Sequence, residues 1–167
     1  MHSMRFLLRT LLVGAALVVA GCTGSDPDIP NGFMNLSGVQ TEYDQTVEDF
    51  PYPLPDGVTF PAQVQQPDPS GPSVIYQKGS GLVQAYQFWE CSWEQVALDS
   101  QGNDQDRVNK ALDELEQGLN SIYRTQYVED PDGGWKSTID KARLGDFGIF
   151  SEFYQSDCGW YRMETGQ

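Results

Sequence analysis

The sequence predicts a mainly α-helical domain, a small bundle of three or four helices with a proline-rich extended segment and one disulfide. Apolar residues recur at steps of three and four through residues 82–154, the spacing of a helix face. Nine of the ten prolines fall within residues 23–72, where they disfavour helix because proline lacks a donor and restricts its predecessor. The helical part also contains two cysteines, Cys91 and Cys158, that can join distant segments.

Two long helices are expected from residue 80 onward. Ser80 is the candidate N-cap of the first, whose apolar face runs over residues 82–97. Residues 101–104 break the pattern and offer a new cap, and a second apolar stripe follows over residues 108–123. Such a short connection favours an antiparallel helical hairpin. Residues 74–76 suit a short strand, although no partner for it is obvious.

Two shorter helices are expected after a loop at residues 130–134. One spans about Lys136–Ala142 and turns Ile139 inward. The other carries an aromatic stripe made of Phe147, Phe150, Phe153 and Tyr154.

Residues 22–72 are expected to form a proline-rich tether and strap ahead of a helical domain at residues 73–167. Residues 22–40 are mostly polar, which is typical of a flexible tether. Residues 50–61 alternate proline with apolar residues, a pattern that favours an extended polyproline form. We expect this stretch to lie as a strap over the helical domain, anchored by Phe50, Tyr52, Leu54 and Phe60. The alternative is a docking motif for a partner protein.

The beginning of the chain is typical of an export signal. A basic region, residues 1–9, precedes an apolar run over residues 11–19 that is too short to remain as a membrane-spanning helix. The run ends in Val19-Ala20-Gly21-Cys22, which resembles the lipobox of bacterial lipoprotein signal peptides. The resemblance implies that residues 1–21 are a signal peptide, cleaved before Cys22. It also implies lipid on the Cys22 thiol and a domain anchored to the cell membrane, facing outside the cytoplasm.

With Cys22 as the lipid site, Cys91 and Cys158 remain as an even pair. In an exported chain such a pair indicates a disulfide. Closing a loop of 67 residues removes unfolded-state entropy worth about 4 kcal/mol.

The chain is strongly acidic, with 24 Asp and Glu against 10 Lys and Arg and a formal net charge of −14. Arg5 and Arg9 precede Cys22 and every acid follows it, so the mature chain keeps 8 bases and 24 acids, a net charge of −16. This charge repels phosphate backbones and argues against nucleic acid as a partner. Solubility alone explains the acidity, although a cationic partner or a metal ion is compatible with it.

Several chemistries are excluded because the one histidine, His2, lies in the signal peptide. The mature chain therefore has no Ser-His or Cys-His catalysis and no histidine general base. With both remaining cysteines paired, no set of nitrogen and sulfur ligands is left for zinc. Residues 78–81 lack the spacing of a phosphate-binding loop, and a helix start explains their glycines. No catalytic, cofactor-binding or metal residue is assigned.

Carboxylates are the remaining candidates for chemistry. Glu90 and Glu94 stand one helical turn apart, and a carboxylate enzyme would need such a pair across a cleft. We expect a solvated helix face instead. Residues 99–106 and 129–132 offer oxygen donors for calcium but lack the order of an EF-hand loop, and turn and cap chemistry explains both.

The tryptophans are candidates either for the core or for recognition. Trp89 and Trp93 lie on the inner stripe of the first long helix, which favours a core role. Trp135 stands beside a loop and is the better candidate for an exposed aromatic that stacks on a ligand or partner.

These observations favour a non-catalytic, membrane-anchored lipoprotein that binds another protein or the cell wall. The alternative is a receptor domain for a small molecule or cation, supported by the acidity and the aromatics. A carboxylate enzyme is the third hypothesis. An exposed aromatic patch would favour the first, an enclosed pocket with converging acids the second, and two buried carboxyls the third.

Overall fold

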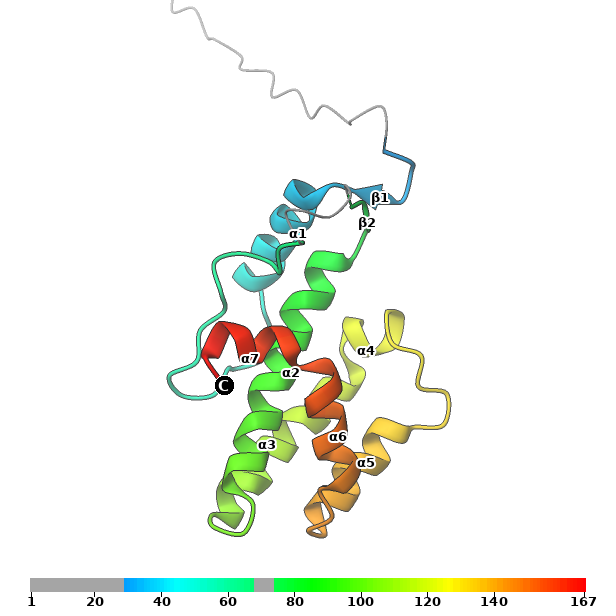
Figure 1. The fold of residues 1–167 in the computed structure, drawn as a ribbon. Helices are drawn as coiled ribbons and strands as arrows, with labels where there is room; N and C mark the ends of the chain where they lie inside the picture. The colour runs from blue at the N-terminus through cyan, green and yellow to red at the C-terminus, as the bar shows by residue number, and fades with distance from the viewer. Residues whose placement is uncertain (1–28, 68–73) are drawn as a thin grey trace, which may run out of the picture.

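The protein is a bundle of short helices around one long central helix, α2 (Ser80–Ser100), in a computed structural model that describes residues 29–67 and 74–167 (Figure 1). This arrangement confirms the predicted fold class, with more and shorter helices than expected. The other elements are β1 (Phe33–Met34), α1 (Leu36–Glu48), β2 (Tyr76–Gln77), α3 (Gln105–Gln117), the 3₁₀ turn η1 (Gly118–Asn120), α4 (Ile122–Gln126), α5 (Gly134–Arg143), α6 (Gly148–Asp157) and α7 (Gly159–Thr165).

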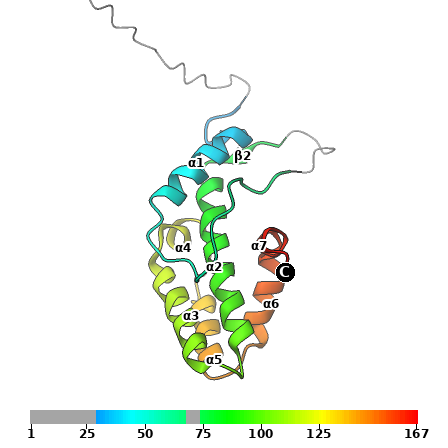
Figure 2. The same ribbon diagram turned by 90° about the vertical axis from the view of Figure 1, so that its left-hand side faces the viewer.

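The predicted hairpin is formed by α2 and α3, which lie side by side (Figures 1 and 2). Asp104 caps α3, as expected, because its carboxylate accepts a hydrogen bond from the backbone N–H of Arg107 at 3.0 Å. The second stripe ends earlier than predicted. The chain tightens into η1, where Gly118 packs against the Trp89 ring, and Ile122 then faces solvent.

The core consists of two hydrophobic clusters. The two C-terminal helices that the sequence predicts are α5 and α6, which complete one of these clusters together with α2 and α3. Ile139 of α5 and Phe150 of α6 are fully buried there. Phe150 also stacks on Trp135, with ring centroids 5.7 Å apart. Phe153, which the aromatic stripe places inward, is instead 39% exposed.

Helix α1 corrects the sequence prediction, because it begins inside the segment interpreted as a flexible tether. Asn35 caps it by accepting a hydrogen bond from the N–H of Gly38 at 3.0 Å. Val39 and Tyr43 then bury one face against α2. The crossing is tight, since a Cβ atom on Gly81 would lie 2.4 Å from the carbonyl oxygen of Val39.

The stretch expected to form a strap lies against the helices (Figure 2). Residues 50–61 have no regular secondary structure and turn at residues 56–57, and the four predicted anchors are partly buried against the two hydrophobic clusters of the core. The Pro53 carbonyl oxygen accepts hydrogen bonds from the indole N–H groups of Trp89 and Trp93, both at 2.9 Å. The apolar residues of this stretch are therefore engaged by the chain's own core rather than displayed for a partner.

The start of α2 is built differently from the prediction. Ser80 is already helical, and its hydroxyl donates to the carbonyl of Gln77. The Glu42 carboxylate of α1 accepts from the N–H groups of Gly79 at 2.9 Å and Gly81 at 2.8 Å. A side chain from another helix thus replaces the local cap.

The expected strand near residue 76 finds its partner in β1, with Met34 opposite Tyr76 in an antiparallel pair. The partner lies in the segment interpreted as a tether, which is why the sequence offered none. Together β1 and β2 hold the beginning of α1 close to the beginning of α2 (Figure 1).

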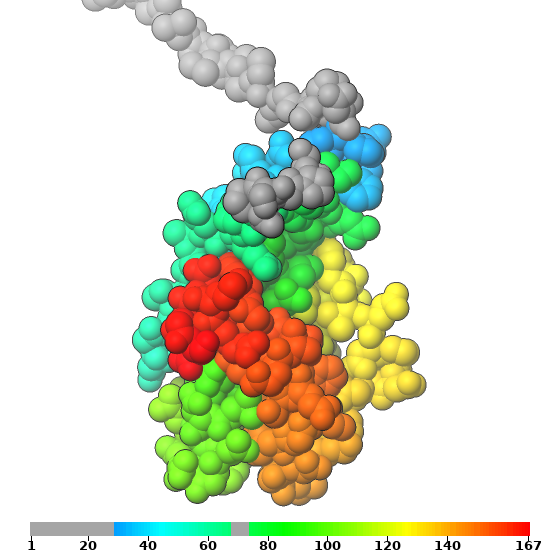
Figure 3. Space-filling view, viewed as in Figure 1, coloured from blue at the N-terminus to red at the C-terminus, as the bar shows by residue number. Residues whose placement is uncertain are grey.

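The disulfide between Cys91 and Cys158 is present, as predicted, with a Cα–Cα distance of 5.5 Å. It joins the middle of α2 to the junction of α6 and α7. Figure 3 shows these C-terminal helices, in orange and red, lying directly on the green surface of α2. The bond therefore fixes the last two helices to the central one.

The signal peptide and the lipid site at Cys22 lie outside the described residues. Within residues 29–67 and 74–167, no helix combines the length and the apolar character needed to cross a membrane.

Candidate functional site

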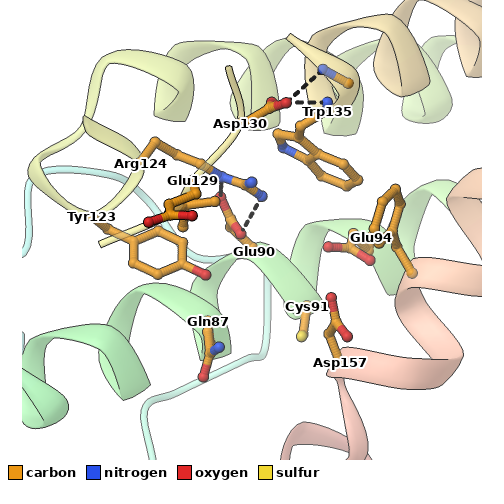
Figure 4. A pocket seen from close by; sticks show the side chains of 13 residues that line it. Gln87, Glu90, Cys91, Glu94, Tyr123, Arg124, Glu129, Asp130, Trp135 and Asp157 are labelled. Atoms are coloured by element: carbon orange, nitrogen blue, oxygen red, sulfur yellow. Dashed lines mark hydrogen bonds and ion pairs between the residues drawn. The ribbon is translucent and has the colours of Figure 1, made fainter. Parts of the chain in front are cut away.

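A cavity of about 220 Å³ lies between α2, α4, α5, α6 and the loop that joins α4 to α5 (Figure 4). Its lining combines carboxyl groups, one guanidinium group and aromatic rings. The carboxyl side chains are Glu90, Glu94, Glu129, Asp130 and Asp157, the base is Arg124, and the aromatic side chains are Tyr123, Trp135 and Phe153. The sulfur-bearing residue Cys91 is also part of the wall.

Glu90 forms a two-pronged ion pair with Arg124. The Nε and Nη2 atoms of the arginine donate to the two carboxylate oxygens, both at 2.7 Å. The guanidinium carbon also lies 4.8 Å from the ring centroid of Trp135 and 5.5 Å from that of Tyr123. Burial raises the pKa of Glu90, while Arg124 opposes that rise. Arg124 thus gives two of its five N–H donors to Glu90 while its guanidinium packs on the two rings.

Glu94 is buried next to this pair without a comparable partner. Among the described residues, no N–H or O–H group donates to its carboxyl. One oxygen of the carboxyl lies 3.9 Å from the Sγ of Cys158, a disulfide sulfur that has no proton to donate. Burial, and secondly the charge of Glu90, raise the pKa of Glu94 well above its ordinary value. Burial therefore favours the neutral, protonated form of Glu94 over the carboxylate.

The expectation of a solvated face for these two glutamates is wrong. Each is only 5% exposed, because α4 and α6 cover this side of α2. The charge pattern of α2 alone does not show that other helices pack over these glutamates. Arg124 follows Glu90 by 34 residues, so no local spacing pointed to the pair.

Trp135 is also placed differently from the prediction, being 5% exposed instead of open to solvent. Asp130 explains its position, since the carboxylate accepts from the backbone N–H groups of Gly134 at 2.6 Å and Trp135 at 3.0 Å. These hydrogen bonds fix the beginning of α5 and lower the pKa of Asp130. The indole lies over the cavity (Figure 4), and its N–H group is buried without an acceptor among the described residues.

The two acidic loops considered for calcium serve as helix caps, as expected. Asp104 caps α3 and Asp130 caps α5. Within the part of the chain that the structure describes, the one cluster with metal-ligand spacing consists of Cys91, Glu94 and Cys158. Its two sulfurs are bonded to each other, so they do not bind a metal as thiolates.

The sequence did not single out Arg124, Tyr123 or Asp157, which complete the cavity. Searches of protein-family models, of curated proteins and of solved structures found no match to this chain, so its function has to be inferred from this site.

Proposed function

We propose that this chain is a lipid-anchored receptor domain, facing outside the cytoplasm, that binds a small organic cation in the cavity beside α2. The lipobox at Cys22 supports the location. A single observation carries the binding role: Glu94 is buried in the cavity wall and has no hydrogen-bond donor among the described residues. A buried acid without a partner costs stability, and a bound ligand can remove that cost.

The charge of the cavity supports a cation. Arg124 neutralises Glu90, which leaves an excess of acids. Three exposed carboxylates, Glu129, Asp130 and Asp157, surround the mouth. Negative charge gathered around a partly closed cavity raises the local concentration of positive ions.

The size and walls of the cavity support an organic ligand. Its volume of about 220 Å³ is below the range of about 300–1,000 Å³ that drug-sized ligands occupy. Trp135, Tyr123 and Phe153 supply apolar surface. A calcium ion would need about six to eight oxygen ligands, and the described residues contain no cluster of three carboxylates with ligand spacing.

The other two hypotheses have less support. The mark of a protein- or wall-binding module was an exposed aromatic patch, yet all four tryptophans are buried and the large aromatic side chains exposed among the described residues are Tyr127 and Phe153. For a carboxylate enzyme, Glu90 and Glu94 are both buried, but both oxygens of Glu90 accept hydrogen bonds from Arg124. Glu90 is therefore not free to act as a nucleophile or base.

The proposal is tested by calorimetry on the full-length chain in detergent. We expect tyramine, a small aromatic amine, to bind, and 4-ethylphenol, the same molecule without the amino group, to bind at least tenfold more weakly. Glu94→Gln should weaken tyramine binding about tenfold or more, a loss typical of one charge-assisted contact. Glu152→Gln, which changes an exposed acid of α6 outside the cavity, is the matched control. Absence of tyramine binding, or equal loss in both variants, would overturn the proposal.

A further inference from the structure

We infer that the ligand is a protonated amine with N–H donors, and that its ammonium group replaces the proton of Glu94 when it binds. The inference rests on the proposed receptor function and adds the chemical class of the ligand. In the exchange, the Glu94 carboxyl loses one proton to solvent and becomes a carboxylate. The amine enters and stays as a cation, so the ion pair forms while the charge of the site is conserved.

The first step of the argument is the charge around Glu94. The titratable groups that line the cavity with it or interact with its charge are the carboxyls of Glu90, Glu129, Asp130 and Asp157, the phenols of Tyr123 and Tyr154, and the guanidinium of Arg124. All but the last are acidic. Arg124 is already held by both oxygens of Glu90. The charge of Arg124 lowers the pKa of Glu94 but does not offset its burial, and no other cation lies among these groups. Burial therefore favours the protonated form of Glu94 until a cation arrives from outside.

The second step separates an N–H cation from a quaternary one. Quaternary ammonium ions bind mainly on the faces of aromatic rings. In this cavity the Arg124 guanidinium already packs on the rings of Trp135 and Tyr123. What the cavity lacks is a hydrogen-bond donor for the Glu94 carboxyl, which a primary or secondary ammonium supplies and a quaternary ion does not.

The third step concerns the other unpartnered group of the same wall. The indole N–H of Trp135 is buried and has no acceptor among the described residues. Because an unpaired buried N–H is costly, we expect the ligand to carry an acceptor, such as a hydroxyl or carbonyl oxygen, in addition to its ammonium group. The ligand class is therefore a small amine that also bears a polar oxygen.

The test measures proton release directly. Tyramine is titrated into the full-length chain at about pH 6, where its amino group is fully charged, in phosphate and in HEPES, two buffers with different heats of ionisation. We expect the measured binding heats to differ between the two buffers. The difference should equal the difference in their heats of ionisation multiplied by the number of protons released, which is at most one. We also expect the affinity for tyramine to increase as pH is raised, by up to about tenfold for each pH unit, as long as the pH is below the pKa of Glu94 in the free protein.

Two variants and one analogue make the outcomes decisive. Glu94→Gln should abolish the buffer dependence, whereas Glu152→Gln should keep it. The N,N,N-trimethyl analogue of tyramine should bind at least tenfold more weakly. Tyramine binding with equal heats in both buffers would overturn the proton exchange and leave the receptor proposal standing. Equal affinity for the analogue would overturn the requirement for N–H donors and likewise leave the receptor proposal standing. Absence of binding by tyramine would overturn both.

Discussion

Two neighbouring faces of α2 carry the same spacing with different side chains. Trp89 and Trp93 are four residues apart on one face, and Glu90 and Glu94 are four residues apart on the next. All four side chains are buried. On the tryptophan face, one strap carbonyl, that of Pro53, accepts from both indole N–H groups. On the glutamate face, Arg124 donates hydrogen bonds to Glu90 and none to Glu94.

The difference shows how a packed surface and a binding surface arise on one helix. A carbonyl oxygen has two lone pairs, so it can accept hydrogen bonds from two neutral N–H donors at once. A single guanidinium carries one charge and cannot neutralise two buried carboxylates. The tryptophan face is therefore complete within the chain, while the glutamate face is left with the unpartnered acid on which the receptor proposal depends.

The largest expected effect comes from removing the single base of the glutamate face. Arg124→Met should lower the free energy of unfolding by about 3–5 kcal/mol, because Glu90 would remain buried without its partner. Denaturant unfolding measures it. Arg143→Met is the matched control, since Arg143 pairs with the more exposed Asp113 and Glu116 and should cost about 1 kcal/mol or less. Equal losses in both variants would contradict a buried role for Arg124.

The next effect is on the tryptophan face. Leu54→Ala should cost about 2 kcal/mol, because Leu54 packs against both halves of the core and the change leaves space beneath the strap. Thr59→Ala, at an exposed position of the same strap, should stay within about 0.5 kcal/mol. If Leu54→Ala were equally harmless, the strap would not contribute to the stability of the core.

A smaller effect is the pH dependence of stability, which we expect from Glu94 on the glutamate face. Because its pKa is raised, Glu94 keeps its proton in the folded state where the unfolded chain has lost it. Its contribution to stability is therefore present below its ordinary pKa of 4.5 and is lost as pH rises toward the folded value. Glu94→Gln should raise Tm by several degrees near pH 8, with a gain that shrinks toward pH 4. A gain that does not change with pH would contradict the buried acid.

The smallest effect comes from removing one of two equivalent donors. Trp93→Phe deletes one hydrogen bond to Pro53 while Trp89 keeps the other. Because the carbonyl stays satisfied, we expect a loss of about 1 kcal/mol, from one net hydrogen bond and a little packing. Trp89→Phe/Trp93→Phe should lose more than the sum of the single changes, because the Pro53 carbonyl then loses both of its indole donors. Strict additivity in a double-mutant cycle would show that the carbonyl finds another donor.

Local patterns were enough for much of the scaffold. The apolar period located α2 and α3, the break at residues 101–104 located their turn, and the alternating prolines indicated the strap. Helix α1 was missed although Asn35 is a good cap and Val39 and Tyr43 share a face. The surrounding prolines outweighed that weaker signal.

By itself, the sequence determined the helical class and the disulfide pairing, because these follow from short-range periodicity and from the number of cysteines. Only the tertiary structure decided which polar side chains are buried. Glu90 meets a base 34 residues away, and Asp130 turns Trp135 over the same cavity. The reason is physical: burial of a side chain depends on what packs over its helix from distant parts of the chain, and the period of one helix does not contain that information.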